Sequence, residues 1–494
     1  MGSVTEPSGR HGKAEKQRKV FLYGCLCAVL LLFGMRFLTN LTDPRYGYDT
    51  YREYRKDIGK YEVLLFGNSH LEFSVYPMEL WRDYGIVSFN MAGRANPLPA
   101  TYWRLINALN DENPRLVVID CFTLCQDKQL EKEYLHRSMD PMPMTADKMW
   151  MICDLMDEPE DQLEFIWNFA IYHERWQDLS QTDFETKVST SKGGREPYNA
   201  VLPTEEMAEK PDEAVKVTSE GMEYLCMMIE ECQRRNIDVL LTYVPFPPTE
   251  MGWQEALCME QIAEEYGIPC INFLDLEIVD FETDCSDKNF HLNASGGRKV
   301  TKYLGQYLTD HYDLKDHRGE TEYASWDEDY RQYTASKLET MAKMESLDNM
   351  LVMLADPSFD CCIYVNGEAD IWRQNELYQL LLENIAGWRT EKLAKAVAQG
   401  SDYLLAVENQ EGRVFEAVDD EVFSEECSLG KLSYEIDENG EKYLILEDRT
   451  GRKASESIQE SAAVTVFVMD NKGDGTVRTK CFTVDKTIIT EKLQ

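Results

Sequence analysis

The chain has 494 residues, 43% of them hydrophobic and 11% aromatic, which excludes a disordered protein. A chain of this length is expected to form about two or three domains. Its formal net charge of −38 predicts an acidic surface that repels phosphate backbones, so nucleic acid is excluded as the expected partner.

The N-terminal region contains one apolar stretch of membrane length, residues 20–38. A bilayer-spanning helix needs about 20 such residues. Five lysines and arginines precede it in residues 1–19, which predicts a cytoplasmic basic tail, a single-pass signal anchor in the cell membrane and an extracellular remainder. A cleaved signal peptide is the alternative, but the residues after the apolar stretch suit cleavage poorly. We expect residues 39–60 to form a stalk.

Short apolar stretches alternate with amphipathic ones across residues 61–312. Strands are expected at 63–66, 86–91, 116–119, 239–244 and 268–273, and helices at 77–81, 97–109, 222–232, 257–266 and 294–308. This alternation predicts an α/β domain with a parallel sheet covered by helices on both faces. Functional sites in such sheets form at the carboxyl ends of the strands.

The alternation is interrupted at residues 125–215, a segment rich in Met and Trp. Long insertions in compact domains are usually lids or binding elements. Extra helices that pack on the core are the alternative interpretation.

The C-terminal part has a different pattern. Residues 313–345 are charged and predict a linker helix, and residues 346–494 predict a separate α+β accessory domain. Helices are expected there at 347–354 and 377–385, and strands at 361–365, 403–407, 414–418, 431–436, 443–446, 463–469 and 477–484. The last two strands are expected to form a hairpin.

Three side chains in two distant segments could together perform nucleophilic catalysis. Ser69 follows the first expected strand, and Asp287 and His291 lie on the loop before the last helix of the α/β domain. A serine hydroxyl becomes a useful nucleophile when a base takes its proton and a third group orients that base. These residues supply all three parts, and this chemistry needs no metal or organic cofactor.

These segments resemble the sequence blocks of the SGNH (GDSL-like) hydrolases. Gly67-Asn68-Ser69-His70 resembles the first block, Ser88-Phe-Asn-Met-Ala-Gly93 the second, and Asp287 to Asn293 the last. The chain is most similar to membrane-anchored cell-envelope proteins, which include relatives of those used in alginate O-acetylation and teichoic-acid D-alanylation. The resemblance implies a flavodoxin-like α/β fold, catalytic Ser69, His291 and Asp287, and an oxyanion hole formed by the amides of Ser69 and Gly93.

The sequence departs from the family pattern at two places. The family's acid stands three residues before the histidine, where this chain has Lys288. The orienting acid is therefore Asp287 after a bulge, or Asp284, or the enzyme works as a dyad. The third block usually supplies an asparagine to the oxyanion hole, and this chain has Asp120 after the third strand. Asn96 could supply that amide.

Candidate substrate-binding residues lie near the serine and in the insertion. His70 could fix the turn or contact the substrate. Within the insertion, Tyr172-His173-Glu-Arg175-Trp176 and Lys192-Gly-Gly-Arg195 are similar to segments of the anchored relatives. His173 and Arg175 could bind a polar substrate or acyl donor, and ordinary surface positions are the alternative.

The expected function is therefore an extracytoplasmic serine esterase or O-acyltransferase, with acetyl as the expected group, acting on a cell-surface polysaccharide or related polymer. A membrane-embedded acyl donor protein is the partner that the resemblance implies. The C-terminal part resembles domains such as the interleukin-like inducer of epithelial–mesenchymal transition, through Phe467 to Lys472 and Cys481 to Asp485, which implies carbohydrate binding. A catalytically inactive glycan-binding or assembly component is the alternative, and a membrane-anchored lipid esterase is a third.

Overall fold

The computed structural model describes residues 9–42, 45–127, 131–184, 189–204, 206–215, 218–288, 291–409, 412–427, 430–448, 451, 453–458, 462–470, 477–483 and 488–491. The chain divides into two compact units: residues 1–56 with 131–189, and residues 57–130 with 190–494. The expected insertion at 125–215 is thus divided, because its central part groups with the N-terminal helices and its flanks group with the sheet.

The first unit is helical. Its helix α1 (Gly9–Thr42) includes Arg18–Thr39, an exposed stretch with a hydropathy of 2.1 that is long enough to cross a membrane. The expected stalk also contains a helix, α2 (Arg45–Lys56). The other elements of this unit are α6 (Lys132–Met139), α7 (Ala146–Leu155), α8 (Pro159–Ile166), α9 (Phe169–Tyr172), η1 (His173–Gln177) and η2 (Gln181–Asp183).

The second unit begins with a parallel sheet of five strands. These are β1 (Val63–Phe66), β2 (Ser88–Asn90), β3 (Leu116–Asp120), β4 (Asp238–Tyr243) and β5 (Cys270–Asn272). Their order is β2-β1-β3-β4-β5 and all neighbours are parallel, which confirms the flavodoxin-like α/β fold. β1 and β3 are buried throughout and carry near-continuous apolar sequences, as expected of strands covered on both faces.

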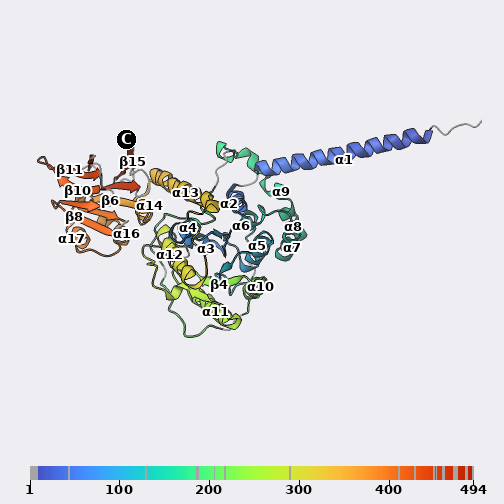
Figure 1. Cartoon of the computed structure of the whole chain (residues 1–494), viewed down its shortest axis with the longest axis horizontal. Helices are drawn as coiled ribbons and strands as arrows, with labels where there is room; N and C mark the ends of the chain where they lie inside the picture. The colour runs from blue at the N-terminus through green and yellow to red at the C-terminus, as the bar shows by residue number, and fades with distance from the viewer. Residues whose placement is uncertain are drawn as a thin grey trace, which may run out of the picture. The chain divides into compact units, whose positions relative to one another are not determined.

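Helices cover the sheet (Figure 1). They are α3 (Ser69–Ser74), α4 (Pro77–Tyr84), α5 (Leu98–Asp111), α10 (Glu220–Arg234), α11 (Glu250–Tyr266) and α12 (Ala294–His311), with the short turn η3 (Phe273–Asp275) after β5. α12 contacts α3 and α4, whereas α5 packs against α10. The chain order predicted from hydrophobic spacing is therefore confirmed, with α3 as an additional turn of helix at Ser69.

The C-terminal part follows η4 (Thr321–Tyr323) and α13 (Ala324–Lys343), and it contains two antiparallel sheets. The six-stranded sheet has the order β15-β14-β13-β6-β7-β8, from Ile488–Glu491, Val477–Phe482, Val464–Asp470, Phe359–Val365, Tyr403–Glu408 and Arg413–Val418. The four-stranded sheet has the order β12-β11-β10-β9, from Lys453–Ser457, Lys442–Asp448, Gly430–Ile436 and Phe423–Cys427. The helical elements are α14 (Leu347–Leu354), η5 (Gly367–Ala369), α15 (Ile371–Gln374), α16 (Leu377–Ala386) and α17 (Glu391–Gln399).

The central strand β6 has both faces buried. Cys361, Ile363 and Val365 belong to a core shared with the helices, and Cys362 and Tyr364 face a second core that includes residues of the four-stranded sheet. Successive strand residues point to opposite faces, so this alternation produces a layer of helices and two layers of sheet. The predicted α+β class of this part is confirmed.

Candidate active site

The turn after β1 positions Ser69. A Cβ on Gly67 would lie 2.9 Å from the Cβ of Asp120, at the end of β3, so the close approach of the two strand ends requires glycine. The Asn68 side chain caps α3 by accepting a hydrogen bond of 3.0 Å from the His70 amide. Ser69 is consequently the first residue of a helix at the carboxyl edge of the sheet, and it is partly exposed.

A closed loop positions His291. An antiparallel bridge joins Cys285 to Leu292, and the Ser286 amide donates to the His291 carbonyl at 2.8 Å. Asn293 then caps α12 by accepting hydrogen bonds from two amides of the first turn. The bridge and the cap fix the loop at both ends, so His291 is held immediately before α12.

The two segments meet through three side chains. Ser69 Oγ lies 2.8 Å from His291 Nε2, and His291 Nδ1 lies 2.5 Å from Asp287 Oδ2. Asp287 Oδ1 also accepts a hydrogen bond of 3.2 Å from the His291 amide. The His291 side chain is 23% exposed and that of Asp287 is 47% exposed, so solvent and a substrate can reach the group. The arrangement is that of a nucleophile, a base and an orienting acid.

Asp284, the alternative orienting acid, is engaged elsewhere. It is fully buried, and its Oδ2 accepts hydrogen bonds from Lys299 Nζ at 2.6 Å and from the Asp280 amide at 2.9 Å. These contacts stabilise the loop and connect it to α12. Of the two candidate acids, Asp287 is the one in contact with the imidazole.

His70 packs against two phenylalanine rings beside His291. It is 3% exposed, it stacks on Phe122 with ring centroids 3.7 Å apart, and Phe246 contacts it edge-on at 5.0 Å. The His291 ring lies 5.1 Å away. Burial, followed by the charge of a protonated His291, lowers the pKa of His70 well below its usual range. His70 is therefore a neutral ring at neutral pH.

The expected oxyanion-hole residues have different environments. The Ser69 amide belongs to the first turn of α3, where amides have no partner inside the helix. The Gly93 amide donates to the Gly67 carbonyl at 3.1 Å. Asn96 is buried, and its side-chain nitrogen would lie 2.5 Å from a Cβ on Gly93. The structure thus brings Asn96 against Gly93, whose amide already has an acceptor.

Two buried carboxyl groups lie beside the site, that of Asp120 at the end of β3 and that of Glu255 on α11. Asp120 accepts hydrogen bonds from the amides of Val244 at 3.0 Å and Phe122 at 3.4 Å, and burial raises its pKa to about 7. Glu255 accepts from the Thr123 amide and from Tyr243, and burial raises its pKa to about 6. Asp120 therefore fastens the loops beside the site through backbone amides.

Two arginines that share a ring contact near His291 received no role from the sequence. The guanidinium carbons of Arg94 and Arg195 lie 5.6 Å and 5.5 Å from the centroid of the Phe73 ring. Phe73 in turn contacts His291 edge-on, with centroids 4.9 Å apart. The Lys192-Gly-Gly-Arg195 segment was the one sequence feature that pointed to Arg195. No pattern in the sequence connects Arg94 to Phe73.

His173 and Arg175 belong to the first unit. Arg175 donates to the Thr42 carbonyl and to Asp183, both at 2.8 Å. His173 is exposed and its ring lies 5.9 Å from that of Phe169. The contacts of Arg175 thus fasten the end of α1 to η1 and η2, and Ser69 belongs to the other unit.

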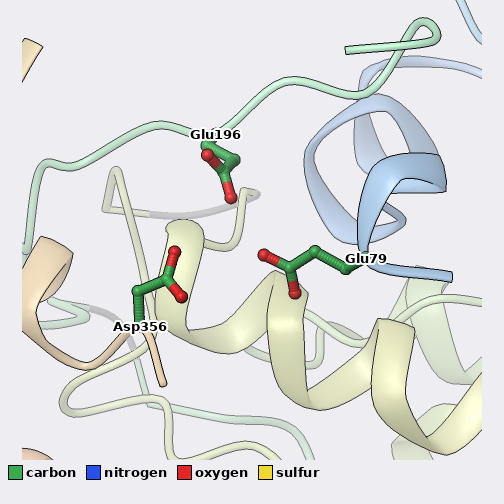
Figure 2. Close-up of side chains that lie close together, drawn as sticks. All are labelled: Glu79, Glu196 and Asp356. Atoms are coloured by element: carbon green, nitrogen blue, oxygen red, sulfur yellow. The ribbon is translucent and has the colours of Figure 1, made fainter. Parts of the chain in front are cut away.

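A cluster of carboxylates could be taken for a metal site. Figure 2 shows Glu79, Glu196 and Asp356 with their carboxylates facing one another. Lys337 Nζ lies 3.2, 2.8 and 2.7 Å from oxygens of these three residues, and Arg298 and Arg82 also pair with the group. Burial opposes ionisation of Asp356, but the charges of Arg298 and Lys337 outweigh it and lower the pKa of this carboxyl. Protein cations thus already balance these carboxylates.

No protein-family model matches the sequence, and no curated protein matches it. Among solved structures, it is similar to a proposed acylhydrolase from Bacteroides fragilis, with 10% identity, coverage of 53% of this chain and 94% of that chain, and a TM-score of 0.28. A likeness at this TM-score carries no argument, so the chemistry has to be inferred from the side chains.

Proposed function

We propose that this protein is a serine esterase or O-acyltransferase that acts on acyl esters, with acetyl as the expected group. The observation that carries the proposal is the chain of contacts from Ser69 Oγ through His291 to Asp287, at 2.8 Å and 2.5 Å. Ser69 Oγ attacks the ester carbonyl while His291 Nε2 takes its proton. His291 returns the proton to the leaving alcohol, and Asp287 stabilises the charged imidazole.

The acyl-enzyme is then released by water or by a sugar hydroxyl. His291 takes a proton from that second nucleophile, which attacks the acyl carbon, and returns the proton to Ser69 Oγ as the bond between Oγ and the acyl carbon breaks. The Ser69 amide and the Asn96 side chain are the proposed donors to the oxyanion. The Gly93 amide joins them only by giving up its bond to the Gly67 carbonyl. Loss of one such donor typically lowers the rate about 100- to 1000-fold.

The proposed setting is the outer face of the cell membrane, with a surface polysaccharide or related polymer as substrate. The exposed apolar stretch of α1 supports anchoring, and the positive charge before it supports a cytoplasmic N-terminus. An acyltransferase of this kind requires a donor, and a membrane-embedded acyl donor protein is the partner that we propose.

The C-terminal part has a cavity that suits a sugar. It has a volume of about 620 Å³ and is lined in part by Tyr378, Asn375, Asp348 and Glu345. An aromatic ring with nearby amide and carboxylate groups provides both the stacking and the hydrogen bonding that a sugar requires. We propose that this part holds a glycan for the esterase.

The proposal is tested with the Ser69→Ala variant of the full chain. Acetate release from an acetylated glycan and from an aryl acetate should fall to background, and labelling by a fluorophosphonate should disappear. Ser336→Ala on α13 is the control, because the Ser336 hydroxyl donates to the carbonyl of Tyr333 in the same helix. Unchanged turnover in Ser69→Ala would remove Ser69 from the mechanism. Glycan binding without labelling of the wild type would favour a non-catalytic glycan-binding component.

A further inference from the structure

Two thiols from distant parts of the chain meet beside the parallel sheet. Cys125 lies in the loop after β3, and Cys258 lies on α11. Both thiols are free, and a hydrogen bond joins their side chains. Cys258 is buried, with 3% exposure, whereas Cys125 is partly exposed. Solvent therefore reaches this pair of thiols from the side of Cys125.

Glu255 holds the loop of Cys125 against α11. Its carboxylate accepts hydrogen bonds from the amides of Thr123 at 3.0 Å and Cys125 at 3.4 Å, and from the Gln126 side chain at 3.3 Å. Glu255 precedes Cys258 by three residues on α11, and residues at this spacing lie on one face of a helix. The backbone at Cys125 is thus fixed over the face that carries Cys258.

The start of α10 holds the same loop. The Ser219 hydroxyl donates to the Leu124 carbonyl at 2.6 Å, and the Gly221 amide donates to the Gln126 carbonyl at 3.2 Å. A Cβ on Gly221 would lie 2.6 Å from the Leu124 carbonyl oxygen, so the loop and the helix are in close contact. Main-chain contacts before and after Cys125 therefore hold its thiol beside Cys258.

The hydrogen bond makes one sulfur of the pair easier to ionise. It lowers the pKa of the Cys258 thiol to about 7, although burial opposes this effect, and Gln254 Nε2 adds a hydrogen bond to the same sulfur at 3.2 Å. The hydrogen bond between the thiols, together with burial, raises the pKa of Cys125. The pair therefore loses one proton near neutral pH and retains the other. A thiolate is the form of cysteine that reacts with disulfides.

We propose that Cys125 and Cys258 form a redox site, which a thiol–disulfide oxidant converts into a disulfide between the loop after β3 and α11. One thiolate of the pair attacks the disulfide bond of the oxidant, forms a mixed disulfide and releases one thiol of the oxidant. The second cysteine then loses its proton and attacks the mixed disulfide, which forms the bond between Cys125 and Cys258 and releases the other thiol. Two electrons and two protons pass to the oxidant, and the hydrogen-bonded sulfurs close to about 2.05 Å.

The disulfide would restrain a loop that reaches the candidate active site. Phe122, in the same loop, stacks on His70, and the His70 ring lies 5.1 Å from that of His291. Disulfides persist in the oxidising space outside a cell, where we propose that this domain lies. The inference does not rest on the proposed esterase activity, since thiol oxidation uses neither Ser69 nor His291.

Oxidation of the full-length wild-type protein by glutathione disulfide tests the site. The remaining thiols are alkylated, the protein is digested, and the peptides are mapped by mass spectrometry. We expect a cross-link between Cys125 and Cys258 and a rise of about 5–10 °C in the unfolding midpoint. Dithiothreitol should reverse both changes. Absence of this cross-link, a link of Cys125 to a different cysteine, or a cross-link that leaves the midpoint unchanged would overturn the proposal.

Serine variants complete the test. Cys125→Ser should abolish both the cross-link and the rise in midpoint caused by the oxidant, and its partly exposed side chain makes the change mild for folding. Cys153→Ser is the matched control, since Cys153 is an exposed thiol on α7, and this variant should keep both responses. A rise in midpoint that persists in Cys125→Ser would overturn the assignment. Turnover enters none of these measurements, so a failure of the esterase proposal would show separately in the Ser69→Ala assay.

Discussion

At the scale of single residues, the loop before α12 accommodates an acid four positions before the histidine. The Ser286 amide closes this loop on the His291 carbonyl, and Asp287 then spans both the amide and the ring of His291. These contacts hold the imidazole with Nε2 toward the Ser69 hydroxyl, which is the task that we propose for Asp287.

Replacement of the acid tests that task. We expect Asp287→Asn to lower kcat for an aryl acetate by roughly 10²–10⁴-fold, because an amide in this position favours the wrong tautomer of the imidazole. Asp284→Asn serves as the comparison, since Asp284 bonds to Lys299 and to the Asp280 amide. That variant should lower the unfolding midpoint but leave kcat close to that of the wild type. A larger loss of kcat in Asp284→Asn than in Asp287→Asn would reverse the assignment.

The carboxyl of Asp120 should make stability depend on pH. Burial raises its pKa to about 7, well above its ordinary value, so the folded protein binds a proton that the unfolded chain has released. Its contribution to the free energy of unfolding therefore falls as the pH rises from about 4 to about 7, by about 1.4 kcal/mol per pH unit. The Asp120→Asn variant should lack this dependence of its free energy of unfolding on pH.

Urea unfolding at pH 4.5 and 7.5 measures the effect. Relative to the wild type, Asp120→Asn should be more stable at the higher pH than at the lower one. Asp313→Asn is the control, since the Asp313 side chain is 93% exposed. If Asp120→Asn and the wild type have the same dependence on pH, Asp120 does not hold a proton in the folded state.

At the scale of elements, hydrophobic spacing predicted the parts of the fold that bury apolar residues. β1 and β3 were recognisable because they are apolar throughout, and α12 because its buried residues recur with helical spacing. The strands β9 and β12 were missed. Their sequences, Phe-Ser-Glu-Glu-Cys and Lys-Ala-Ser-Glu-Ser, are polar because both lie at edges of the four-stranded sheet. Edge strands of this kind lack the apolar pattern that would identify them.

The candidate site was likewise predictable in part from the sequence. Ser69, Asp287 and His291 stand in a known order at strand and helix ends, so their meeting could be expected, and their catalytic roles remain predictions. Arg94 and Arg195 have no such order. The segment that carries Arg195 is held by Lys192, which lies in a buried pair of carboxylates, and a contact of that kind depends on the tertiary fold.

Gly193 lies where the segment from Lys192 to Arg195 packs closely against the end of β2. An added Cβ would meet the Asn90 carbonyl oxygen at 2.0 Å, in a backbone conformation that already disfavours side chains. We expect Gly193→Ala to lower the free energy of unfolding by more than about 2 kcal/mol. Gly267→Ala is the matched control, because Gly267 also has positive φ but open space around it, and should cost about 1 kcal/mol. Equal losses in urea unfolding would show that the collision is relieved.

At the scale of the whole molecule, a buried network of charges connects distant parts of the second unit. Glu79 lies on α4, Arg298 on α12 and Lys337 on α13, while Asp356 lies between α14 and β6. The helices of the parallel sheet and the start of the C-terminal part thus share one set of ion pairs. This network gives the unit a fixed geometry rather than much net stability, because desolvation offsets most of the attraction between the charges.

Replacement of Lys337 tests how the charges of this network affect the free energy of unfolding. Lys337→Met removes the cation that contacts all three buried carboxylates and leaves Arg298 and Arg82 to balance them, so the free energy of unfolding should fall by about 3–5 kcal/mol. Lys392→Met is the control, because Lys392 pairs with Glu421 at 45% exposure and should contribute about 1 kcal/mol or less. A chelator should leave wild-type unfolding unchanged, since Lys337 lies between the three carboxylates. A chelator-induced loss as large as that of Lys337→Met would instead place a metal ion in the network, and the lysine would then be its competitor.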